Sequence, residues 1–216
     1  MRPNTPEWYA ARKGGIGASD APIIMGHSPW KTISALYKEK QTPYVEGTET
    51  SNFAMEHGRA MEPEAYEAFI EMTGFTMAYD TDAMFQWNQE LKFDGKLWQF
   101  ATFDGLIYDD PFIQDTFVEI KCPLREKTHL QARNGEIPEH YYTQMQHQMS
   151  VHPQKPPFAY YFSYFQTEGI ILKIDRDEEA IKKIIDAELA FMECLKSCTP
   201  PVRRKNNRKT APIIDA

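Results

Sequence analysis

The heptapeptide FVEIKCP constrains the fold of this chain more than any other stretch. Alternation along a β-strand places Glu119 and Lys121 on one face and Val118, Ile120 and Cys122 on the other. The second face needs an apolar layer behind it, while the first carries a carboxylate and an amine. By itself this pattern fits the solvated face of an edge strand, so a functional interpretation depends on the rest of the chain.

Strand-like and helical segments follow one another in an order that predicts an α/β protein of the α+β kind, a mixed sheet with helices packed on it. Strands are expected at residues 83–87, 98–108, 117–122, 157–165 and 169–175. Helices are expected at residues 28–40 and 51–73, over about three turns after Pro138, and at residues 175–197. The glycine-rich stretch GGIGASDAPIIMG near the start is expected to be turn-like.

A carboxylate, Glu62, shares a helical face with Tyr66 and Phe69. Such a group is costly beside an apolar stripe unless it is paired or binds a metal. The alternative is a helix cap ahead of Pro63, because Gly58 and Pro63 interrupt the helical pattern and a regular helix could begin only at Pro63.

Asp104 lies in ATFDGL, upstream of Glu119, and two adjacent strands would bring these positions side by side. Two carboxylates with a lysine on the same face form an arrangement that a hard divalent cation such as Mg²⁺ requires. Lys121 could then act on a water molecule or balance a phosphate charge. The spacing alone is weak evidence, because it occurs by chance in many chains.

The net charge of −7 argues against binding nucleic acid through bulk charge, although the segment RRKNNRK at residues 203–209 is basic. No apolar run reaches membrane-spanning length and no signal peptide is evident, so a cytoplasmic protein without a membrane partner is expected. The 3 cysteines provide no disulfide framework. His140, His147 and His152 are not spaced to share one helical turn, so a carboxylate site explains the pattern better than zinc.

Five motifs resemble, in order, those of the phage lambda exonuclease and YqaJ-like viral recombinase family of the PD-(D/E)XK nuclease superfamily. They are ARKGGIGASDA, GRAMEPEAYEAF, ATFDGL, VEIKCP and IPEHYYTQMQHQMSV. The resemblance covers residues 8–165 and implies a restriction-endonuclease-like core with flanking helices. We therefore expect a single nuclease domain over residues 1–216, with a basic tail from about residue 199.

The resemblance implies a 5′→3′ exonuclease that degrades one strand of linear duplex DNA from 5′-phosphorylated ends to mononucleotides and leaves 3′ overhangs. It implies two Mg²⁺ ions, with Mn²⁺ able to substitute, held by Glu62, Asp104, Glu119 and the carbonyl of Ile120. Lys121 would act on the attacking water. The implied assembly is a homotrimeric ring in the bacterial host cell, encoded by a phage or prophage, with a single-strand annealing protein as partner.

The resemblance also assigns the contacts to the 5′ phosphate and the DNA. By position, these residues are Arg12 and Ser19, with Thr102 as a further phosphate contact and Gln144 as the helix glutamine that faces the active site. Without the resemblance, a surface turn, a strand threonine and a solvated glutamine would explain Ser19, Thr102 and Gln144.

The chain departs from many relatives at Thr102-Phe103-Asp104-Gly105, where they have Ser-Pro-Asp-Gly, and at His57-Gly58, where they have Trp-Gly. Two alternatives remain open: an endonuclease or repair nuclease of the same superfamily, and a DNA-end-binding module without catalysis. Retention of Asp104, Glu119 and Lys121 argues against the second.

Overall fold

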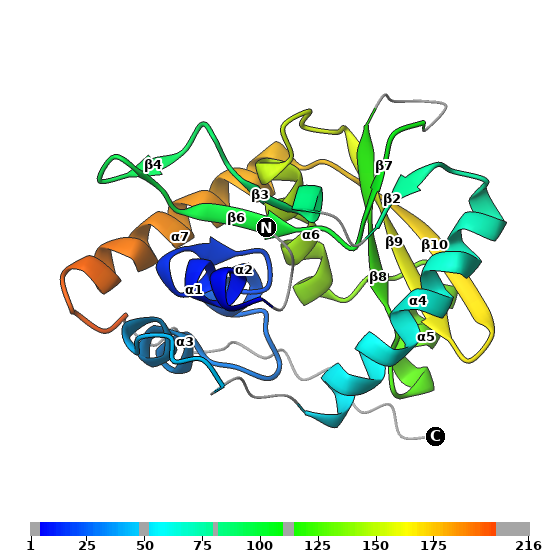
Figure 1. The fold of residues 1–216 in the computed structure, drawn as a ribbon, viewed down its shortest axis with the longest axis horizontal. Coiled ribbons are helices and arrows are strands. Elements are labelled where there is room, and N and C mark those ends of the chain that lie inside the picture. Colours follow the sequence, from blue (N-terminus) through cyan, green and yellow to red (C-terminus); the bar gives the residue numbers. More distant parts are fainter. Residues whose placement is uncertain (1–4, 48–51, 80–81, 110–114, 202–216) are drawn as a thin grey trace, which may run out of the picture.

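The computed structural model describes residues 5–47, 52–79, 82–109 and 115–201 (Figure 1). The basic segment 203–209 lies outside the described residues. The α-helices are α1 (Pro6–Gly14), α2 (Ala21–Met25), α3 (Ile33–Gln41), α4 (Phe53–Thr73), α5 (Glu126–Arg133), α6 (Glu139–Val151) and α7 (Glu178–Lys196), with a 3₁₀ turn, η1, at Asp82–Met84.

The strands are short apart from the β9–β10 hairpin. They are β1 (Ile16–Gly17), β2 (Met77–Ala78), β3 (Phe85–Trp87), β4 (Lys92–Phe93), β5 (Lys96–Leu97), β6 (Gln99–Thr102), β7 (Gly105–Ile107), β8 (Thr116–Lys121), β9 (Phe158–Phe165) and β10 (Glu168–Asp175).

Within the described ranges, the central sheet has five strands in the order β10-β9-β8-β7-β2. The β8–β9 pair is parallel, whereas β7–β8 and β9–β10 are antiparallel. The sheet is therefore mixed, as predicted, and β8 is an inner strand. The edge-strand interpretation of FVEIKCP is wrong, because neighbours pair with both sides of β8.

The segment predicted as one strand at residues 98–108 is two strands in two sheets. The chain leaves β6 after Thr102 and enters β7 at Gly105. Between them Phe103 is buried, and its backbone N–H donates to Met84 O at 2.9 Å. In the described part of the chain, β6 lies in a separate sheet of order β1-β6-β3.

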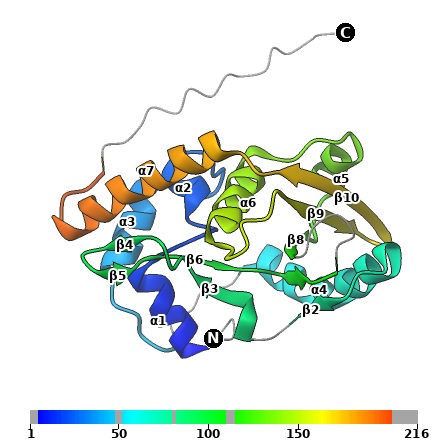
Figure 2. The same cartoon turned by 90° about the horizontal axis from the view of Figure 1, so that it is seen from above.

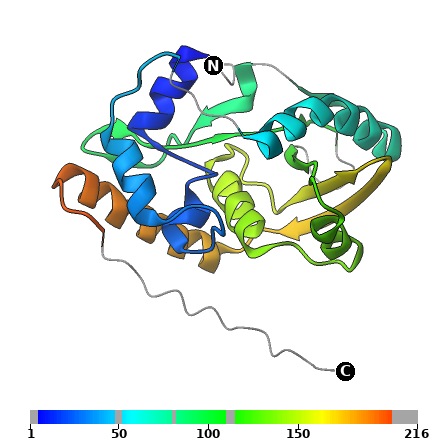
Figure 3. The ribbon, with the colours of Figure 1, turned by 90° about the horizontal axis from the view of Figure 1, so that it is seen from below.

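Helices cover both faces of the central sheet. Figure 2 shows α4 on one face and α5 and α6 on the other. Phe69 of α4 packs with Val118, Ile120 and Phe162, and Met145 of α6 belongs to the core on the opposite face. Seen from below, α2 (blue) lies beside α6 (yellow-green) (Figure 3). No helix of the described residues is long and apolar enough to cross a membrane.

Helix α4 begins ten residues before Pro63, the residue at which we expected regular helix to start. The Asn52 side chain accepts a hydrogen bond from Met55 N and caps the helix, so Glu62 is not a cap. Pro63 is exposed, and the cost of a proline within a helix is outweighed here by the apolar face that α4 buries at Ala65 and Phe69.

Candidate active site

Asp104 and Glu119 meet where β7 and β8 pair. Gly105 lies opposite Val118, and the next step of this antiparallel register places Asp104 opposite Glu119. Asp104 Oδ2 accepts a hydrogen bond from the backbone N–H of Ile120 at 2.8 Å. A glycine after the aspartate leaves room for the Met77 side chain, since a Cβ at Gly105 would lie 2.7 Å from its sulfur and would have to displace it. The local chain thus holds one carboxylate against the neighbouring strand.

Glu119 and Lys121 share the face of β8 that lies toward α6. The Lys121 ammonium bonds to Glu119 Oε1 and lies 5.2 Å from the centre of the Tyr141 ring. Burial lowers the pKa of Lys121, but the carboxylates of Glu119 and Asp104 raise it on balance above its usual value. Lys121 is therefore an ammonium group in this arrangement.

Two glutamines of α6 donate hydrogen bonds to the Glu119 carboxylate. Gln144 Nε2 donates to Oε1, and Gln148 Nε2 donates to Oε2 at 2.5 Å and also to Thr102 O at 3.1 Å. Our sequence reasoning named only Gln144. The spacing of four residues places Gln148 on the same helical face and could have identified it.

The third expected carboxylate, Glu62, approaches the same place from α4. Burial raises the pKa of Asp104 well above its usual value, and the negative charges of Glu119 and Glu62 raise it further. Burial and the Glu62 charge likewise raise the pKa of the Cys122 thiol to about 12. The carboxylates of Glu62, Asp104 and Glu119 are therefore close enough for their negative charges to repel one another.

This donor set fits a hard divalent cation in its chemistry. Buried carboxylates that repel one another gain when a cation neutralises them, and oxygen is the ligand that Mg²⁺ prefers. As the side chains stand, the described ranges contain no group of three His, Cys, Asp or Glu residues placed to hold an ion. In this arrangement Lys121, Gln144 and Gln148 donate hydrogen bonds to the oxygens of Glu119.

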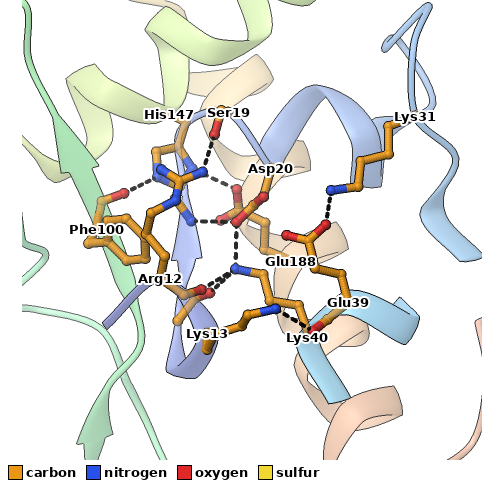
Figure 4. Close-up of polar contacts among 12 residues, drawn as sticks. Arg12, Lys13, Ser19, Asp20, Lys31, Glu39, Lys40, Phe100, His147 and Glu188 are labelled. Atoms are coloured by element: carbon orange, nitrogen blue, oxygen red, sulfur yellow. Dashed lines mark hydrogen bonds and ion pairs between the residues drawn. The ribbon is translucent and has the colours of Figure 1, made fainter. Parts of the chain in front are cut away.

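Arg12 and Ser19 lie together, and a tryptophan links them to β6. Arg12 Nη2 donates to Ser19 Oγ at 3.0 Å (Figure 4). The Arg12 guanidinium lies 4.5 Å from the centre of the Trp8 ring, and Trp8 Nε1 donates to Thr102 Oγ1 at 3.2 Å. Our sequence reasoning missed Trp8, although its spacing of four residues from Arg12 on α1 was a usable signal. Thr102 and Gln148 then connect this group to Glu119.

A buried ion pair holds the C-terminal end of α1, where Arg12 lies. Lys40 Nζ lies 2.7 Å from Asp20 Oδ2 and donates to the backbone carbonyls of Arg12 and Gly15 (Figure 4). Burial alone would raise the pKa of Asp20, but Lys40 and Arg12 lower it overall. The ionised carboxylate of Asp20 is thus linked through Lys40 to the end of α1, which sequence reasoning did not anticipate.

The glycines of GGIG are expected to let the backbone approach a ligand, and this stays a prediction. Two of them also allow close packing within the protein. A Cβ at Gly15 would lie 2.6 Å from Trp98 O, and one at Gly17 would lie 2.7 Å from the Phe100 ring. Gly15 and Gly17 thus allow β1 to lie against its neighbour, β6. The turn-like prediction holds for residues 18–20, but the stretch also contains β1 and α2.

The three histidines near α6 have separate environments. His147 Nδ1 lies 2.6 Å from Glu188 Oε1, and its Nε2 lies 2.8 Å from Phe100 O (Figure 4). His152 packs 5.4 Å from the Phe103 ring, and His140 packs against Trp30. They serve packing and hydrogen bonding in different parts of the fold.

A family model and a curated protein both match this chain. A family model described as the YqaJ-like viral recombinase domain matches residues 7–155. The chain is 29% identical over 187 residues to the uncharacterized protein YqaJ of Bacillus subtilis (strain 168), covering 86% of this chain and 54% of that protein. The chain thus spans about half the length of the curated relative it matches.

Solved structures with similar folds are described as exonucleases. The alkaline exonuclease LHK-Exo of Laribacter hongkongensis has 26% identity and a TM-score of 0.72, covering 90% of this chain and 94% of that one. Its complex with dAMP has a TM-score of 0.70 at the same identity and coverage. A phage related exonuclease from Haemophilus somnus 129PT has 16% identity and a TM-score of 0.63, covering 85% of this chain and 94% of that one. This likeness supports the fold alone. These likenesses confirm the expected fold class.

Proposed function

The chain belongs to the YqaJ-like viral recombinase family, and from that premise we propose that it is a Mg²⁺-dependent exonuclease of the lambda exonuclease type. It degrades one strand of linear double-stranded DNA in the 5′→3′ direction, from 5′-phosphorylated ends to mononucleotides. The remaining 3′ single strand then serves recombination by annealing. The similarity to an alkaline exonuclease supports a nuclease, while strand polarity and metal identity rest on the family resemblance.

One observation carries this proposal. Asp104, Glu119 and Lys121 lie together. Gln148, Thr102 and Trp8 connect them to the group formed by Arg12 and Ser19. A carboxylate site suited to divalent metals thus adjoins a guanidinium and hydroxyl suited to phosphate. An enzyme that hydrolyses a phosphodiester beside a terminal phosphate requires both.

Glu62, Asp104 and Glu119, with the Ile120 carbonyl, would hold two Mg²⁺ ions, and Mn²⁺ would substitute. When bound, such ions supply positive charge that activates the attacking water and stabilises the leaving 3′ oxygen. Gln144 and Gln148 hold the Glu119 carboxylate in place through their amides. Lys121, as an ammonium, donates hydrogen bonds that orient water or scissile phosphate.

Arg12 and Ser19 would bind the terminal 5′ phosphate, with Thr102 beside them. Trp8 limits the freedom of both Arg12 and Thr102, because it contacts the guanidinium with its ring and the hydroxyl with its indole N–H. A guanidinium held in this way loses less rotamer freedom when it binds an anion. The terminal phosphate would then set where the scissile bond lies.

The wider setting rests on the family resemblance. We propose one nuclease domain over residues 1–216, a homotrimeric ring around the DNA, a single-strand annealing protein as partner, and action in the cytoplasm of a host cell for a phage or prophage. A ring explains how an acidic chain, with net charge −7, could stay on DNA through many turnovers.

The test compares linear duplexes that carry 5′-phosphate or 5′-hydroxyl ends with a closed circle, each with Mg²⁺ or with EDTA. Mononucleotide release from linear DNA alone, faster with 5′ phosphate and absent in EDTA, supports the proposal. Labels at the 5′ and 3′ ends report the polarity. Cutting of the circle would favour an endonuclease, and binding without cutting would favour a DNA-end-binding module.

A further inference from the structure

Trp30 is a large apolar side chain that the fold leaves in solvent. Its side chain is 74% exposed, whereas Trp98 is 1% exposed. An indole buries a large apolar area when it finds a partner, so an exposed one is informative when it lies near a binding site. Trp30 lies in the connection between α2 and α3.

The Trp30 segment is held in place by specific bonds. Ser28 Oγ accepts hydrogen bonds from the backbone N–H groups of Trp30 and Lys31, each at 3.3 Å. His27 precedes Ser28, and its Nδ1 is hydrogen-bonded to Thr143 Oγ1 at 2.8 Å, which links the segment to α6. These hydrogen bonds therefore hold the backbone of the exposed Trp30 ring in place beside α6, the helix that carries Gln144.

A series of ring contacts leads from Trp30 to the candidate active site. The Trp30 ring meets the His140 ring nearly at right angles, with centroids 4.7 Å apart. The His140 ring lies 4.1 Å from the Tyr141 ring, and Lys121 Nζ lies 5.2 Å from the Tyr141 centroid. This packing supports the indole from one side and leaves most of its surface open. A nucleic-acid strand whose phosphate lies at Lys121 would carry its neighbouring bases along this series.

From this geometry we infer that Trp30 is a stacking platform for a nucleobase of the DNA strand at the active site. The inference rests on the proposed function, and adds a contact to the bases where the site described above contacts only phosphates. Aromatic stacking suits such an enzyme, because every base has a π-face and the contact does not depend on sequence. A sequence-independent exonuclease needs contacts of this kind as it moves along the strand.

The test is equilibrium binding of a short 5′-phosphorylated single-stranded oligonucleotide with a 3′ fluorophore, measured by anisotropy in EDTA so that no cleavage is needed. Trp30→Ala should weaken binding about 5- to 150-fold, the loss expected for one base–aromatic stack. Trp30→Phe should retain most of the affinity, because it keeps an aromatic face. Tyr108→Ala is the matched control: Tyr108 is an exposed aromatic, 48% accessible, that follows β7 at the end away from Asp104.

A second probe, with abasic residues in place of the bases near the 5′ end, separates stacking from any other effect. The wild type and Trp30→Ala should bind this strand equally. If Trp30→Ala binds the normal strand as the wild type does, or loses as much affinity for the abasic strand, the stacking inference is wrong while the nuclease proposal stands. If the wild type binds normally and depends on Trp30, yet releases no nucleotide with Mg²⁺, the nuclease proposal fails and the stacking contact remains.

Discussion

The buried pair of His147 and Glu188 should respond very differently to two substitutions. Both side chains are fully buried, and Glu188 Oε2 also accepts a hydrogen bond from Gln99 at 2.8 Å. Because His147 Nε2 faces the carbonyl of Phe100, it must donate there, and Nδ1 faces Glu188. The pair therefore carries one proton more than a neutral imidazole beside a carboxylate would carry.

His147→Leu leaves the Glu188 carboxylate buried without its counter-charge. Breaking a buried ion pair in this way costs about 3–5 kcal/mol. Glu188→Gln should cost under about 1 kcal/mol, because its amide can donate to His147 Nδ1 while its oxygen still accepts from Gln99.

The pH dependence of stability should be weaker in Glu188→Gln than in the wild type. Burial lowers the pKa of His147, but Glu188 raises it on balance above 6.5. The pair's stabilisation is therefore complete below pH 6.5 and lost as pH rises through the folded-state pKa. In Glu188→Gln the Glu188 charge that raises the pKa of His147 is lost, while burial still lowers it, so this stabilisation at low pH should be smaller.

Urea unfolding followed by circular dichroism, at about pH 5.5, 7 and 8.5, measures these differences against the wild type, so that other titrating groups cancel. The cost of His147→Leu should be largest at about pH 5.5, where the pair's stabilisation is complete, and smaller at about pH 8.5. The reasoning is refuted if the cost of His147→Leu is the same at about pH 5.5 and 8.5, or if Glu188→Gln is as destabilising as His147→Leu.

Three further predictions concern the candidate site. Lys121→Ala should lower mononucleotide release by about 100-fold or more while DNA binding persists, and normal turnover would remove Lys121 from the chemistry. Arg12→Ala should reduce the ratio of rates on 5′-phosphate and 5′-hydroxyl ends by about tenfold, with partial retention in Arg12→Lys; an unchanged ratio would exclude Arg12 from the phosphate pocket. Gln148→Leu removes a buried hydrogen bond to Glu119. It should lower the free energy of unfolding by about 1.5–3 kcal/mol and slow cleavage. Gln154→Leu, on the exposed turn after α6, should do neither.

The boundaries that sequence patterns predicted well belong to elements with strong periodicity. Helix α7 and strands β8, β9 and β10 lie within a few residues of their expected ranges, because each presents a continuous apolar face. Errors occurred where local and tertiary preferences compete. Phe103 is as apolar as its strand neighbours, and only its burial beside Met84 divides β6 from β7.

The sequence by itself determined that Glu119 and Lys121 share one face of a strand with an apolar layer behind it, because side-chain alternation is a property of the backbone. Only the tertiary structure decided which groups meet that face. Gln148 from α6 holds Glu119, and Trp8 from α1 reaches Thr102 across the boundary between two sheets. Periodicity reports the faces of a single element, whereas the pairing of those faces is set by long-range packing of the whole chain.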